Sequence, residues 1–112
     1  MTVDRQLVTE ILDQLEDDIL NFEWLVKIAQ LQNRDRSELD CVSVILDSVM
    51  VLHCNGEIIV GDAIKESDMV LIQPWPEARQ ELRTRILSTI QTSDRGDRPF
   101  CFWIQLTKHF AK

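Results

Sequence analysis

Two histidines, His53 and His109, are the side chains of this sequence whose ordinary pKa lies near neutral pH. They are therefore the first candidates for general acid–base catalysis. His53 follows an apolar run and precedes Cys54. A histidine at the edge of the core explains that setting better than a catalytic one does.

Three cysteines, Cys41, Cys54 and Cys101, could in principle bind a metal ion. A structural zinc site uses clustered ligands such as a pair of Cys-x-x-Cys motifs, and these cysteines are too far apart in sequence to form one. Their odd number and apolar neighbours predict reduced, buried thiols in a cytoplasmic protein. We expect no metal ion and no other cofactor.

Other catalytic motifs are missing as well. The three glycines are scattered, so they form no phosphate-binding loop, and no Gly-x-Ser-x-Gly motif is present. Asp17 and Asp18 are adjacent, and adjacent residues of a helix point in different directions. The sequence therefore predicts a binding protein and not an enzyme.

Carboxylates are the chemical groups that this sequence supplies in excess. Its 112 residues hold 19 acidic and 12 basic side chains, for a net charge of −7. Residues 1–40 carry ten acidic and four basic residues, whereas residues 77–112 carry four acidic and seven basic ones. This distribution predicts opposed faces, of which the acidic one suits a basic protein partner. Solubility is the simpler explanation of the same acidity.

Two acidic segments are the candidate contact sites for such a partner. The first is the loop expected between two strands, with Asp62, Glu66 and Asp68. The second is the polar side of the first predicted helix, which could equally be a solvated outer face. Its candidates are Glu10, Asp13, Glu16 and Asp17.

The same composition argues against several classes of partner. An acidic chain is poorly suited to nucleic acid, which is bound largely through Lys and Arg contacts to phosphate. No apolar run approaches the length of about 20 residues that spans a bilayer. The first residues lack the basic and apolar regions of a signal peptide. We expect one domain, residues 1–112, in the cytoplasm, with its oligomeric state open.

The stretch from Ser37 to Asp62 is the predicted centre of the fold. Ser37 and Asp40 have the spacing of a helix N-cap and its partner, and apolar residues follow on nearly every face, as in a buried helix. Asn55-Gly56 ends that helix, and a strand begins at Glu57.

The remaining elements are predicted from their hydrophobic spacing. We expect a first helix capped by Thr2 or Asp4 and reaching about Leu20, and a second helix from about Asn21 that holds Trp24 in the core or at a hinge. After the central helix we expect strands at residues 57–62 and 69–73, joined by a loop. A helix then opens at Pro76 and ends near Ser93, a strand spans 100–106, and a frayed tail follows. Trp75 and Trp103 are assigned to the core. The class is α+β: three helices, a strand pair, one helix and a final strand in a small antiparallel or mixed sheet.

A helix pair followed by a hairpin is also the outline of a winged helix-turn-helix. The helix that would read DNA, residues 37–54, contains Glu38, Asp40 and Asp47 but no Lys or Arg. The hairpin loop is acidic too. DNA binding is therefore disfavoured, although a winged-helix relative that binds protein stays open.

The second half of the chain resembles a family of small bacterial immunity proteins of polymorphic toxin systems, including contact-dependent growth inhibition. The features that carry the resemblance are a helix ending in glycine, strands closing on Gly-Asp and Pro-Trp, a helix with several arginines, and a final aromatic strand. They correspond here to Gly56, Gly61-Asp62, Pro74-Trp75, Arg79, Arg83, Arg85 and Phe102-Trp103.

The resemblance implies a cytoplasmic protein that binds its cognate toxin and blocks it without catalysis. Many such toxins are basic enzymes that act on nucleic acid, and the acidic composition fits that role. The alternative is a non-catalytic regulatory or adaptor protein.

Overall fold

The computed structural model describes residues 4–110 and contains five α-helices and four strands. The chain runs through α1 (Arg5–Leu15), β1 (Leu20–Asn21), α2 (Phe22–Gln32), α3 (Glu38–Cys54), β2 (Ile58–Glu66) and β3 (Met69–Pro74). It continues through α4 (Arg79–Thr92), a 3₁₀ turn (Arg98–Phe100), β4 (Trp103–Leu106) and α5 (Thr107–Phe110). The α+β class is thus confirmed, and the order of elements differs from the prediction in detail.

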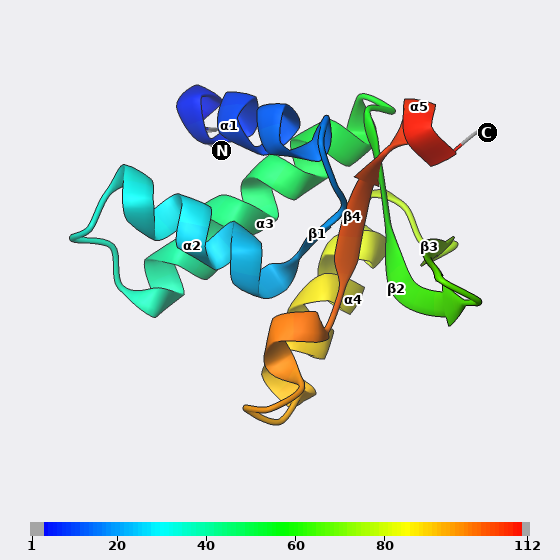
Figure 1. Cartoon of the computed structure of the whole chain (residues 1–112). Coiled ribbons are helices and arrows are strands. Elements are labelled where there is room, and N and C mark those ends of the chain that lie inside the picture. Colours follow the sequence, from blue (N-terminus) through cyan, green and yellow to red (C-terminus); the bar gives the residue numbers. More distant parts are fainter. Residues whose placement is uncertain (1–3, 111–112) are drawn as a thin grey trace.

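The sheet has the strand order β1-β4-β2-β3, and all of its pairs are antiparallel. The last strand of the chain, β4, lies between β1 and β2 (Figure 1). Ile104 and Leu106 of β4 are buried in one cluster with residues of α1 to α4, while Trp103 and Gln105 alternate to the other face. Helices α1 to α4 therefore cover one face of the sheet.

Helix α3 lies at the centre of the helical layer, as expected (Figure 1). Ser37 and Asp40 form the predicted capping box, and Gly56 follows the helix with a φ of +74°. Ser48 is fully buried, and its hydroxyl donates to the Val44 carbonyl within the helix. Local signals were sufficient for this element because both of its ends carry a cap.

Three predicted boundaries were wrong. Helix α1 ends at Leu15, and Leu20 belongs to a two-residue strand that pairs with Ile104. Strand β2 continues to Glu66, so the expected loop shrinks to the turn Ser67-Asp68. Helix α4 begins at Arg79, and Pro76, the predicted first residue, lies outside it.

The C-terminal part of the chain also differs from expectation. Strand β4 is shorter than predicted, since Arg98–Phe100 forms a 3₁₀ turn. Residues 107–110 of the expected frayed tail are helical. Asp4 caps α1, whereas the alternative cap, Thr2, lies outside the described residues.

Several predictions about burial need correction. Trp24 is 45% exposed and not a core residue. Trp75 is buried as expected, but Trp103 is only half-buried. Cys54 is exposed, whereas Cys41 and Cys101 are buried. His53 lies at the boundary of the core, as predicted.

Candidate functional site

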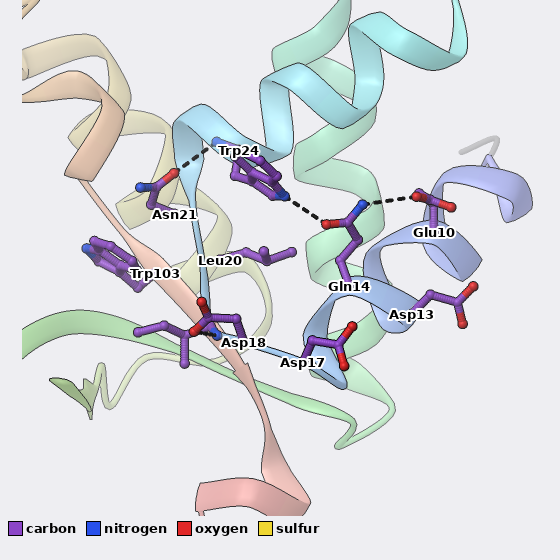
Figure 2. Close-up of a pocket in the computed structure, with 10 residues that line it drawn as sticks. Glu10, Asp13, Gln14, Asp17, Asp18, Leu20, Asn21, Trp24 and Trp103 are labelled. Carbon is purple, nitrogen blue, oxygen red and sulfur yellow. Dashed lines mark hydrogen bonds between the residues drawn. The ribbon is translucent and has the colours of Figure 1, made fainter. Parts of the chain in front are cut away.

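A groove of about 570 Å³ lies beside β1, between the C-terminal half of α1 and the beginning of α2 (Figure 2). Four carboxylates and two tryptophans contribute to its wall, and no lysine or arginine does. We call it the acidic groove, and its lining residues are Glu10, Asp13, Gln14, Asp17, Asp18, Ile19, Leu20, Asn21, Trp24 and Trp103.

The Trp24 indole is held in place from α1. Its Nε1 donates a hydrogen bond to Gln14 Oε1 at 2.9 Å, and Gln14 Nε2 donates to Glu10 Oε1 at 3.1 Å (Figure 2). The Trp24 backbone N–H donates to Asn21 Oδ1, which caps α2. A large aromatic surface is thus exposed to solvent in an ordered orientation beside three further carboxylates.

Trp103 reaches the groove from β4. Its ring stacks on that of Phe100 with a centroid distance of 6.1 Å and an interplanar angle of 20°. Asn21 is its partner in the sheet. Because directly paired residues of antiparallel strands project on the same face, this pairing brings the indole to the start of α2.

The charge around the groove is mostly negative. Among residues 4–110, the salt bridges do not involve Asp13, Asp17 or Asp18. Close to the groove, Lys27 Nζ lies 5.5 Å from the centroid of the Trp24 ring and 3.9 Å from Glu23. Aromatic faces attract cations, so Lys27 shows that this indole can accept one.

Glu16 faces a second, smaller hollow of about 390 Å³. Its Oε1 accepts from Lys108 Nζ at 2.7 Å, and this hydrogen bond lowers the pKa of the Glu16 carboxyl. Asp17 lies where the two hollows meet, since it lines both. His109 also lines the second hollow, but no hydrogen bond or ion pair within residues 4–110 joins its ring to a carboxylate.

The hairpin acids form a separate site. Glu66 ends β2 and Asp68 lies in the exposed turn that follows, and neither lines the acidic groove. Asp62 sits at the hairpin base, where its Oδ2 accepts from Trp75 Nε1 at 3.0 Å. Of the seven predicted contact residues, the structure therefore gathers Glu10, Asp13 and Asp17 in one groove.

Seven of the ten groove residues were not predicted as site residues, among them Gln14, Asp18, Trp24 and Trp103. Gln14 could have been found, because it follows Glu10 by four residues and so shares its helix face. Trp24 could have been found by helical spacing. The buried face of α2 is formed by Phe22, Leu25, Ile28 and Ala29, and Trp24 is not among them. Trp103 reaches the groove through strand pairing, for which the sequence holds no local signal.

Helix α3 is poorly placed to read DNA. Six of its residues, including Ile45 and Val49, are buried, and Asp47 on its outer side pairs with Arg83 of α4 at 3.0 Å. The helix thus lies between its neighbours rather than along a free face (Figure 1).

Metal binding and membrane insertion would each need a recognisable arrangement of residues. Within residues 4–110, no group of three or more His, Cys, Asp or Glu residues is placed to hold a metal ion. No helix in this range combines the length and the hydropathy required to cross a membrane.

Comparison with known proteins found no matching family model, no matching curated protein and no matching solved structure. The groove and the charges around it are therefore the features of this chain that bear on its function.

Proposed function

We propose that this chain is an immunity protein that binds and neutralises a basic toxin domain, of the kind that acts on nucleic acid, in the cytoplasm. The observation that carries the proposal is the acidic groove, which four carboxylates and two indoles line and to whose wall no lysine or arginine contributes. Such a surface is complementary to Lys and Arg side chains, which a nucleic-acid enzyme presents where it holds phosphate.

The chemistry of the groove suits binding better than catalysis. Carboxylates accept charge-assisted hydrogen bonds from Arg and Lys, and indole faces add cation–π attraction and apolar contact area. An acidic partner also associates faster with a basic one, an effect that salt weakens. The neutralising action proposed here is steric and electrostatic cover of the toxin's substrate surface, so it involves no chemical step.

The proposal is tested by removing the groove charges without changing side-chain size. The triple variant Asp13→Asn, Asp17→Asn and Asp18→Asn removes three carboxylates from the groove. A matched control removes three exposed carboxylates elsewhere, by Glu81→Gln, Asp94→Asn and Asp97→Asn. Both variants lose the same net charge, so a difference between them reports position.

The readout has two stages. A basic protein captured from the source cells at low salt is expressed alone to measure its toxicity, and then with wild type or with either variant. We expect wild type and the control to relieve toxicity and the groove variant to fail. A captured protein without toxicity, or full protection by the groove variant, would overturn the proposal.

A non-catalytic adaptor is the second candidate, favoured by the helix pair α2–α3 followed directly by the β2–β3 hairpin. That order keeps the outline of a winged helix while α3 is buried. In the same capture experiment, recovery of a regulatory protein that is harmless on its own would support the adaptor.

A further inference from the structure

The structure contains one complete example of a guanidinium bound to an indole. The guanidinium of Arg85 lies over the Trp75 ring and pairs with the Glu77 carboxylate. The Trp75 Nε1 donates to Asp62 Oδ2, so the ring is fixed at its edge while its face meets the cation. This arrangement has three parts: an indole held through Nε1, an accessible ring face, and a carboxylate near the cation.

Trp24 in the acidic groove has the same parts but no guanidinium. Its Nε1 donates to Gln14 Oε1 at 2.9 Å, so this indole too is held at its edge (Figure 2). The residue is exposed and lines the groove. Lys27 lies over the same ring, but Lys27 does not line the groove. The part of the indole that lines the groove is therefore accessible to a cation from a partner.

The carboxylates of the groove have no cationic partner within the chain. Among residues 4–110, the ion pairs involve none of Glu10, Asp13, Asp17 and Asp18. Like charges that line one hollow repel one another, and a cation placed among them relieves this repulsion. A guanidinium has five N–H donors in one plane, so it can contact two carboxylates at once or one carboxylate through two hydrogen bonds.

A guanidinium suits this arrangement better than an ammonium does. Its plane stacks on an aromatic face while its N–H groups reach acceptors at its edge, whereas the ammonium of lysine is a compact and strongly hydrated charge. The two cations that this chain places on its own indoles differ in the same sense. Arg85 lies 4.1 Å from the centroid of the Trp75 ring, and Lys27 lies 5.5 Å from that of Trp24.

We infer that the acidic groove binds an arginine side chain of the partner, stacked on Trp24 and paired with the carboxylates that line the groove. The inference rests on the proposed function, since it takes the groove as the contact site, and it adds the kind of side chain that the groove selects. Gln14 is a positioning residue, because it holds the indole from α1. A partner surface rich in arginine then binds more tightly than a lysine-rich surface of equal charge.

Two capped peptides of equal length and charge, hexa-arginine and hexa-lysine, test this selection on the purified chain without a toxin. We expect isothermal titration calorimetry at low salt to show that the wild type binds hexa-arginine about tenfold more tightly than hexa-lysine. Trp24→Leu should remove this preference, and Trp24→Phe, which keeps an aromatic face, should retain part of it. Phe110→Leu is the matched control, because it removes an exposed aromatic ring that does not line the groove.

A second variant tests the orientation of the indole. Gln14→Ala keeps Trp24 but removes the acceptor of its Nε1, so it should also lower the preference for arginine. Equal affinity of the wild type for the two peptides, binding of neither, or a preference that persists in Trp24→Leu would overturn the inference. A toxin that is neutralised through the groove without any preference for arginine would refute this inference alone. A preference for arginine in a chain that relieves no toxicity would refute the proposed function alone.

Discussion

The indole Nε1 of Trp75 donates a hydrogen bond to Asp62 Oδ2 at 3.0 Å, although the two residues lie on opposite sides of the β2–β3 hairpin base. A face of the same indole meets α4, where the Arg85 guanidinium lies 4.1 Å from the centroid of the Trp75 ring and pairs with Glu77. The carboxylate predicted as a contact for a partner thus joins the hairpin to the last long helix.

Replacement of Asp62 by alanine is expected to destabilise the fold. The change leaves the N–H of the buried Trp75 without its acceptor, at a cost of about 1–3 kcal/mol. Asp62→Asn retains an oxygen acceptor and should cost less. Urea unfolding of the two variants measures the difference. Equal stability of Asp62→Ala and wild type would show that this hydrogen bond does not stabilise the fold.

Gly61 should tolerate no side chain. A Cβ atom at this position would lie 2.0 Å from the carbonyl oxygen of Gln73, a backbone atom that cannot move aside without shifting β3. We expect Gly61→Ala to lower the free energy of unfolding by about 3 kcal/mol or more. Gly96→Ala is the matched control, because a Cβ added there would meet no atom within 4 Å and its effect should be small. Similar denaturant midpoints for the two variants would contradict the close approach of β3.

Acid should weaken the contact of Asp4 with α1 and Arg36. The backbone N–H of Leu7 and the Arg36 guanidinium together hold the pKa of Asp4 below its ordinary value of 3.8. A lowered folded-state pKa stabilises the fold at pH values above 3.8, and this contribution is lost as the pH falls through the folded-state pKa. The stability difference between wild type and Asp4→Asn should therefore be constant near neutral pH and shrink in acid. Urea unfolding at several pH values measures it, and a difference independent of pH would contradict the assignment.

One thiol of three should react in the native protein. Cys54 is exposed, whereas Cys41 and Cys101 are buried, and burial raises the pKa of Cys101 to about 11. Because the thiolate is the reactive form, iodoacetamide should add one group to the folded chain and three after unfolding. Mass spectrometry counts the additions, and Cys54→Ser should reduce the native count to zero. Rapid native labelling of Cys101 would show that its surroundings open.

Elements with local signals were predictable from the sequence. Ser37, Asp40 and Gly56 define both ends of α3 through side chains and backbone preferences within a few residues of each end. The predicted start of α4 was wrong. Proline is common as the first residue of a helix, and Pro76 was assigned that place, yet the chain bends again at Arg79, where φ is +55°. That conformation is unfavourable for a side chain with a Cβ, so no propensity could indicate it.

Only part of the acidic groove was predictable, because only some of its residues are brought together by local structure. Glu10 and Asp13 share a side of α1 through helical spacing alone, and Asp17 lies in the turn that follows the helix. Trp24 joins them through its hydrogen bond to Gln14, and Trp103 joins them because β1 pairs with β4, at Leu20 with Ile104 and at Asn21 with Trp103. This pairing connects residues far apart in the sequence, and its energy lies in tertiary contacts.

The position of β4 inside the sheet also has a consequence during synthesis on the ribosome. Leu20 and Asn21 of β1 are synthesised early, but their partners, Ile104 and Trp103, are synthesised near the end of the chain. A nascent chain can form its helices first, since their contacts are local, while one wall of the acidic groove is still missing. Translation would thus delay partner binding until the sheet closes, so a growing chain could not engage a partner through a half-made surface.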